Sequence, residues 1–138
     1  NSGRLSTPTP YLESPLNTPD ADAFEGAMHP GTPCADAPVT VAGRPGWLLN
    51  HLGDGFVLLA FGDAPADDVA VGGVAARVLR VGRDLADARG LLAERYDARP
   101  GTVYLIRPDQ HVAARWRAFD AARVQAALAR AIGINPGT

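Results

Sequence analysis

The sequence contains one cysteine, Cys34, and no long hydrophobic run. A single thiol cannot close a disulfide within the chain, and no Cys-x-x-Cys motif is present, so a reducing, cytoplasmic setting is expected. The longest nearly pure apolar run, FVLLAF at 56–61, is far too short to span a bilayer. The first forty residues also lack the basic flank and apolar stretch of a signal peptide. We therefore expect no membrane partner.

The chain also lacks an excess of positive charge. Its net charge of −2 at pH 7 and its sequence pI of about 5.9 exclude the basic surface that nucleic acids require. No GxGxxG fingerprint occurs, because VGGVAARV at 71–78 has two glycines without the required spacing. With 138 residues, 46% of them hydrophobic, the chain can form one domain with a modest core.

Proline divides the chain into two unequal parts. Residues 1–45 hold eight of the twelve prolines, which remove amide donors and fix φ, so regular structure is not expected there. This part nevertheless carries spaced apolar residues, as an extended arm lying along another surface would. They are Tyr11, Leu12, Leu16, Phe24 and Met28. We predict an arm over 1–45, entering from a longer protein, and a folded domain over 46–138.

From Trp47 onward the pattern becomes regular. Strands are predicted at WLLNHL (47–52), at FVLLAF (56–61), where the continuous run indicates burial on both faces, and at ARVLRVG (76–82). The segment between the last two, 63–75, is predicted to be a loop or a weak helix. TVYLIRPDQHVAARWR (102–117) then indicates a hairpin, since Pro108 and Asp109 supply turn chemistry between two apolar strands.

Two helices are predicted. DLADARGLLAERYDA (84–98) is capped by Asp84 or Asp87. The terminal helix starts after Asp120, with Phe119 and Val124 spaced as a hydrophobic staple and Gly133 in the C-cap position. Strands, an intervening helix, a hairpin and a last helix give an α/β class, with a central mixed sheet of thioredoxin-like topology and flanking helices.

Two stretches resemble thioredoxin in sequence as well as in topology. They are GFVLLAFGDAPADDV (55–69) and YDARPGTVYLIRPDQHVA (96–113). Where thioredoxin carries its cysteines this chain has only DAPADD (63–68), and Gly101 stands where the cis-proline would be. Because thiol–disulfide exchange needs an attacking and a resolving thiol, the resemblance implies the frame and not the activity.

A second resemblance covers nearly the whole chain. SPLNTPDADAFEGAMHPGTPCADAPV (14–39), GFVLLAFG (55–62) and VYLIRPDQHVAARWR (103–117) are similar to the C-terminal portion of FAD-dependent aromatic-ring hydroxylases, flavoprotein monooxygenases like phenol hydroxylase. Members commonly end in a LIRPDGHVAWR-like segment. Here Gln110 replaces the glycine, and an extra alanine precedes Arg115.

The resemblance implies that the full-length protein binds FAD and uses NAD(P)H and O2 to hydroxylate a phenolic substrate. It places the flavin and substrate sites in the preceding domains of the same chain. We therefore predict no catalytic, cofactor-binding or metal residue in this part, which alone is inactive. Its expected role is accessory, bracing those domains or a homodimer contact.

Several residues could instead form a redox, metal-binding or ligand-binding site. Cys34 as a lone redox thiol lacks a partner that would lower its pKa. His29, His51 and His111 are 22 and 60 residues apart, unlike the short spacings of zinc sites. The carboxylates that could hold a cation are Asp54, Asp63, Asp67 and Asp68. Trp47 and Trp116 fit core or interface packing better than ligand stacking.

The stretch LIRPDQHVAARWR (105–117) most resembles a site, with three arginines, a histidine and an aspartate. As a hairpin it places Arg115 and Arg117 opposite Trp116, and Arg107 near Asp109. We predict that the cluster is chemically inert. Its two arginines face either water or the preceding domains. A free-standing, redox-inactive binding module with the same fold is the alternative function.

Overall fold

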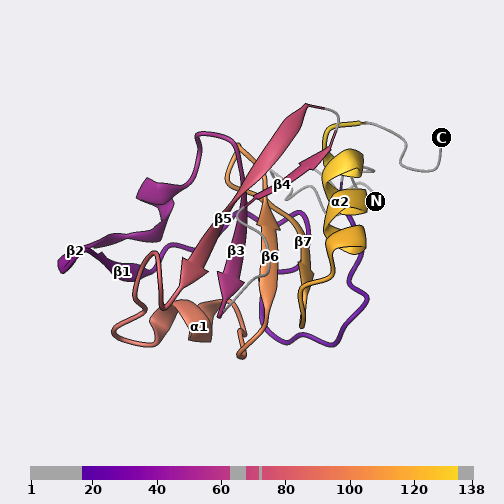
Figure 1. Ribbon diagram of the computed structural model, residues 1–138. Coiled ribbons are helices and arrows are strands. Elements are labelled where there is room, and N and C mark those ends of the chain that lie inside the picture. The colour runs from indigo at the N-terminus through magenta and orange to yellow at the C-terminus, as the bar shows by residue number, and fades with distance from the viewer. Residues whose placement is uncertain (1–16, 63–67, 72, 134–138) are drawn as a thin grey trace, which may run out of the picture.

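The computed structural model describes residues 17–62, 68–71 and 73–133. Its centre is a five-stranded sheet in the order β4-β5-β3-β6-β7 (Figure 1). These strands are β3 (Phe56–Phe61), β4 (Asp68–Val71), β5 (Val74–Val81), β6 (Val103–Ile106) and β7 (Val112–Trp116). β3 runs parallel to β5, and the other pairs are antiparallel. The predicted α/β class with a mixed sheet is confirmed.

The prediction that β3 is buried on both faces is confirmed. Val57 and Leu59 belong to the apolar cluster on one face of the sheet, and Leu58 and Ala60 to the cluster on the other. Successive side chains of a strand point to opposite faces, so a continuous apolar run is what a strand between two layers requires. Each face of the sheet is therefore covered by its own layer.

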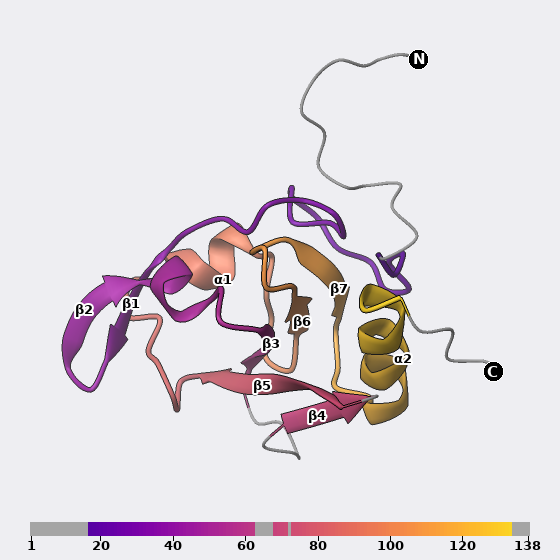
Figure 2. The same cartoon turned by 90° about the horizontal axis from the view of Figure 1, so that it is seen from above.

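The two layers differ in kind (Figure 2). One face is covered by the N-terminal arm, the short helix α1 (Leu91–Arg95), the 3-10 turn η1 (Leu48–His51) and the strand β1 (Pro38–Val41). The other face is covered by α2 (Ala121–Ala131), which contacts β4, β6 and β7. The arm side is thus irregular, whereas the α2 side is a regular helix-on-sheet packing.

The terminal helix α2 forms as predicted. The Asp120 carboxylate accepts a hydrogen bond from the Arg123 N–H at 3.1 Å, which satisfies one of the free donors of the first turn. Phe119 and Val124 both join the α2-side cluster. Gly133 has a φ of 84°, the left-handed conformation that ends a helix.

Helix α1 is shorter than predicted, Leu91–Arg95 instead of 84–98. Gly90 has a φ of 71°, a left-handed conformation that interrupts the helical backbone immediately before it. Of the two predicted caps, Asp87 serves the helix, because its carboxylate accepts from the N–H groups of Leu92 at 3.1 Å and Ala93 at 2.9 Å. Asp84 instead accepts from Arg80 N–H at 2.7 Å.

The expectation of no regular structure before Trp47 is wrong at its end. A hairpin pairs β1 with β2 (Arg44–Trp47), and its turn residues Ala42 and Gly43 have φ values of 52° and 78°. Two positive φ values suit the twist of a two-residue hairpin turn. The predicted strand 47–52 is instead η1, and its Leu49 N–H donates to the Asp36 carboxylate at 3.1 Å.

The segment predicted as a loop or weak helix after β3 contains β4, which pairs antiparallel with β5 across Val71 and Val74. The strand has only four residues, which is too short for a periodic pattern to stand out in the sequence. Pairing with β5 and contact with α2 stabilise it instead. Tertiary contacts therefore override the weak local signal.

Candidate functional site

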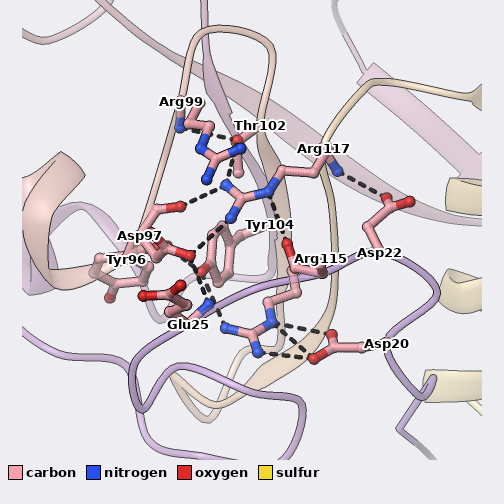
Figure 3. A network of polar contacts seen from close by, with 11 residues as sticks. Asp20, Asp22, Glu25, Tyr96, Asp97, Arg99, Thr102, Tyr104, Arg115 and Arg117 are labelled. Atoms are coloured by element: carbon pink, nitrogen blue, oxygen red, sulfur yellow. Dashed lines mark hydrogen bonds and ion pairs between the residues drawn. The ribbon is translucent and has the colours of Figure 1, made fainter.

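The polar cluster of greatest interest lies on the arm side of β7. Arg115 and Arg117 are two residues apart and lie on the opposite side of the strand from Trp116, as predicted. Trp116 packs in the cluster beneath α2. Neither arginine faces open water, because both are covered by the arm (Figure 3). We call these two side chains and their arm partners the arginine clamp.

Arg115 holds the arm through Asp20. Its Nη2 and Nε lie 2.7 and 3.0 Å from the two carboxylate oxygens, a bidentate arrangement. The Arg115 side chain is 4% exposed and that of Asp20 is 27% exposed. Burial alone would lower the pKa of Arg115, but the hydrogen bonds that it donates to Asp20 and Tyr104 outweigh burial and raise the pKa. The guanidinium therefore stays charged.

Arg117 joins three segments. Its Nη2 lies 2.7 Å from the Asp97 carboxylate and its Nη1 2.6 Å from the Asp97 carbonyl, just beyond α1. Its Nε donates to the Ala23 carbonyl at 3.0 Å, and its backbone N–H donates to the Asp22 carboxylate at 2.9 Å. A single side chain thus links β7 to the arm and to the end of α1.

Phe24 packs against both arginines. The Arg117 guanidinium carbon lies 3.8 Å from the ring centroid and that of Arg115 lies 4.3 Å from it. The ring also meets Tyr104 edge to face, with centroids 6.0 Å apart. The negative face of an aromatic ring attracts a cation that lies over it, and the attraction is stronger when the cation is partly shielded from water. Phe24 therefore anchors the arm by apolar contact and by cation–π attraction together.

Below the clamp, two tyrosines carry hydrogen bonds into the core. The Tyr104 hydroxyl donates to the Tyr96 carbonyl, and the Tyr96 hydroxyl donates to the Ala35 carbonyl at 2.6 Å. The two rings meet edge to face at 5.0 Å, and burial raises the pKa of each hydroxyl. Both hydroxyls are therefore proton donors in structural hydrogen bonds, and the second one ties Ala35 of the arm to β6 through Tyr96.

Asp97 is the acidic partner contributed by the domain itself. It follows α1 with a φ of 48°, a left-handed conformation that costs a non-glycine residue about 1–2 kcal/mol. The Glu25 N–H donates to its carboxylate at 2.6 Å. That hydrogen bond is the main cause of the lowered pKa of Asp97; burial acts in the opposite direction, and the Arg117 guanidinium lowers the pKa further. These contacts offset the backbone strain.

The arm also covers the free edge of β7 with its backbone. Thr18 N–H donates to the Ala113 carbonyl at 2.9 Å, and Gly31 N–H to the Val112 carbonyl at 2.7 Å. Val112 N–H donates back to the Thr32 carbonyl at 2.9 Å. An uncovered edge strand is a template for pairing with another chain. The clamp thus fixes a segment that also caps the sheet.

The turn between β6 and β7 has, at Gln110, the left-handed backbone that glycine adopts most easily. Gln110 has a φ of 64°, in the left-handed region. Its side-chain amide donates to the Leu49 carbonyl at 3.1 Å, and its own carbonyl accepts from Cys34 N–H at 2.8 Å. Arg107 and Asp109 form the predicted pair, with Nη2 and a carboxylate oxygen 2.7 Å apart. Substitution of the glycine therefore leaves the turn intact.

Each of the three histidines takes part in a separate structural hydrogen bond. His111 places Nδ1 3.1 Å from the Asp109 carbonyl in the turn between β6 and β7. The carbonyls of His29 and His51 accept hydrogen bonds from Thr32 and Arg77, respectively. Within residues 17–62, 68–71 and 73–133 no group of three His, Cys, Asp or Glu side chains could hold a metal ion.

Of the carboxylates considered as a cation site, Asp54 is exposed and Asp68 begins β4. Asp63 and Asp67 lie outside the described residues, as do Tyr11, Leu12 and Leu16 of the arm. The described part of the chain also contains no helix that is long and apolar enough to cross a membrane.

Cys34 is a buried free thiol in the arm, 8% exposed. Burial raises its pKa to about 12, although a hydrogen bond with Tyr96 acts in the opposite direction. The thiolate is the form that attacks disulfides and binds metals. At neutral pH Cys34 is therefore a protonated core side chain that packs beside Met28 and Val39 in the arm-side cluster.

The two tryptophans have opposite environments. Trp116 is 3% exposed and packs in the cluster beneath α2 with Val124 and Leu128. Trp47, at the end of β2, is 51% exposed. Core or interface packing was predicted for both; core packing is confirmed for Trp116, and interface packing of Trp47 stays a prediction.

Sequence reasoning missed the clamp's acidic half. Asp20, Asp22 and Phe24 alternate along the arm with a period of two, the same period that separates Arg115 from Arg117. Two extended segments with matched alternation present complementary side chains to each other. The chain contains no lysine, so all 13 of its basic residues are arginines, which can both chelate a carboxylate and stack on a ring.

With this geometry established, comparison with known proteins identifies the family. Residues 27–134 match the family described as the C-terminal part of aromatic-ring hydroxylases. The match extends over most of the chain, and the chain belongs to this family. No curated protein matches.

Two solved structures share the fold. The first is a ternary complex of aklavinone-11 hydroxylase with FAD and aklavinone, with a TM-score of 0.69 and 29% identity over 86% of this chain. The second is the flavin-dependent monooxygenase PieE with FAD and substrate, with a TM-score of 0.69 and 23% identity over 85%. This chain spans 25% and 24% of those two chains, about a quarter of their length.

Proposed function

We propose that this chain is the accessory C-terminal domain of an FAD- and NAD(P)H-dependent monooxygenase that hydroxylates a phenolic aromatic substrate in the cytoplasm. The family match and the FAD-containing neighbours support the class of enzyme. The domain supplies none of the chemistry. Its task is to hold the arm that leads from the flavin-binding domains in one fixed path.

The arginine clamp is the observation that carries this proposal. Arg115 and Arg117 are the functional groups that most resemble a catalytic pair. Their described hydrogen bonds nevertheless go to the arm, to Asp97, to Thr102 just before β6 and to Tyr104 of β6. Phe24 closes the remaining face of both guanidinium groups. A substrate carboxylate or phosphate would have to displace Asp20 first. The geometry therefore favours a structural latch.

The thiol and the two buried tyrosines also support a structural role. The only thiol is buried, with its pKa raised to about 12. Tyr96 and Tyr104, whose hydroxyls are also buried, donate to backbone carbonyls. A free-standing binding module is disfavoured, because the chain spans only about a quarter of each neighbour's length.

The test uses the complete hydroxylase with Arg115→Ala and Arg117→Ala combined. If the clamp is structural, the variant unfolds at a lower temperature while its kcat and KM for the phenolic substrate stay at the wild-type values. Arg123→Ala, which removes an exposed arginine of α2, is the matched control and should change neither property. A fall in kcat with flavin content and thermal stability unchanged would contradict the accessory role.

A further inference from the structure

Trp47 is the one large hydrophobic side chain that stands exposed among the described residues, at 51%. It ends β2, on a hairpin that projects from the sheet at the end of the molecule opposite α2 (Figure 1). Burial of the large apolar surface of an indole is favourable, and an exposed tryptophan lacks that stabilisation. Tryptophans are also enriched at protein–protein interfaces. Its exposure therefore points to a contact made elsewhere in the protein.

Beside Trp47 lies a groove of about 580 Å³ between the hairpin and the loop before α1. Its size is that of pockets that accept a side chain or a short segment. Its lining is mainly apolar, with Thr40, Asn50 and Arg89 as its polar residues. The principal lining residues are Pro38, Val39, Pro45, Trp47, Asn50 and Arg89. We call this feature the Trp47 groove.

The groove is held in shape by the fold. Thr40 and Ala86 exchange two backbone hydrogen bonds, at 2.9 and 2.7 Å, which fasten the loop to the hairpin. The Arg95 side chain donates to the Asp36 carbonyl at 2.7 Å, which joins α1 to the residues just before β1. Binding here would therefore spend little free energy on ordering the surface.

Two arginines lie at the groove, Arg89 in its lining and Arg44 next to the lining residue Pro45. Arg44 and Arg89 are exposed, and neither side chain has a hydrogen bond or ion pair with another described residue. The carboxylates of the neighbouring loop keep their charge but are bound within the domain, since Asp84 accepts from Arg80 N–H and Asp87 from Leu92 N–H of α1. A partner that suits this surface offers an apolar side chain for the groove and carboxylates for its rim.

We propose that the Trp47 groove docks onto the flavin-binding portion of the same hydroxylase chain, at an apolar segment flanked by acidic residues. This inference rests on the proposed function. About three quarters of each neighbour's chain lies outside the region that this domain covers, so such a portion is tethered nearby at high effective concentration. The clamp fixes the arm on one side, and the groove supplies a second point of attachment.

A second copy of the domain fits this surface less well. A symmetric dimer through the groove would set the same patch against itself. Arg44 and Arg89 would then face their own copies, and like charges across an interface oppose association. Covalent tethering and charge together favour the flavin-binding portion as the occupant.

The test places a photo-crosslinking phenylalanine analogue at position 47 of the complete hydroxylase. The analogue is aromatic and the site is exposed, so folding is retained. The matched control carries it at Gln125, an exposed position of α2 at the opposite end of the molecule. After irradiation, peptides are identified by mass spectrometry and the bound flavin is measured in the same sample.

We expect an intrachain cross-link from position 47 to an apolar segment of the flavin-binding portion that is flanked by acidic residues. We expect none above background from position 125. A cross-link between two copies, or no cross-link in a protein that retains flavin and hydroxylates its substrate, would overturn the docking proposal and leave the proposed function standing. A complete protein that binds no flavin would instead refute the proposed function.

Discussion

The two faces of β7 hold their neighbours by different physics. On one face Trp116 packs beneath α2 in a cluster of aliphatic side chains. On the other, Arg115 and Arg117 hold an irregular arm through carboxylates and one aromatic ring. Apolar packing needs a regular, shape-matched partner, whereas bidentate charges can fix an extended segment that has no fold of its own. One strand therefore packs into the core on one face and holds the arm through the arginine clamp on the other.

Trp116→Ala should have the largest effect, because it empties the apolar face. Truncation of a buried tryptophan removes about 3–5 kcal/mol from the free energy of unfolding. Urea titration of the 138-residue chain measures the loss, which should be nearly the same in low and high salt. A strong salt dependence would mean that this face is not held by packing.

Arg115→Ala should come next. Removing one partner of a buried ion pair costs about 3–5 kcal/mol, and we expect about 2–3 kcal/mol because Asp20 is 27% exposed and can regain water. Arg115→Lys keeps the charge but loses the two-pronged geometry, so it should recover only part of the loss. The measurement is again urea titration. Full recovery by lysine would show that charge alone holds the arm.

Phe24→Leu should have a smaller effect. Leucine keeps most of the apolar contact but removes the ring face on which both guanidinium groups stack. The cation–π contribution is about 1 kcal/mol at a partly exposed site. The free energy of unfolding should fall by about that amount. Phe119→Leu, at the half-buried aromatic position on the α2 side, is the matched control.

Acid should weaken the latch before it affects the α2 side. The pKa of Asp97 is lowered in the folded chain, so this carboxylate stabilises the fold above its unfolded value of 3.8, and that stability is lost as the pH falls through the lower folded value. Thermal midpoints measured below pH 4 should therefore decrease, and Asp97→Asn should remove part of the decrease. An unchanged acid profile in that variant would contradict the assigned role of Asp97.

Local patterns predicted the regular side of the molecule. The continuous apolar run of β3, the turn residues between β6 and β7, and the Asp120 cap of α2 are signals that lie within a few residues of the structure that they specify. Each of these elements is present as predicted. On the α2 face, the sequence thus predicted these elements but not β4, which packs against α2.

The arm side could not be derived in the same way. Asp20 and Arg115 are 95 residues apart, and no local signal pairs them. Strands β1 and β2 have four residues each, and α1 begins after a left-handed Gly90, so tertiary contacts decide their form. The sequence placed Arg115 and Arg117 on one side of the strand, but it could not show that Asp20 and Asp97 are their partners.

Amide hydrogen exchange in Arg115→Ala combined with Arg117→Ala tests the latch most directly. The reporters are the N–H groups of Thr18 and Gly31, which bond to β7, and of Val124 and Leu128 in α2. If arginines hold the arm, the two arm amides exchange much faster in the variant, while the α2 amides keep their wild-type protection. Unchanged protection of Thr18 and Gly31 would contradict the account.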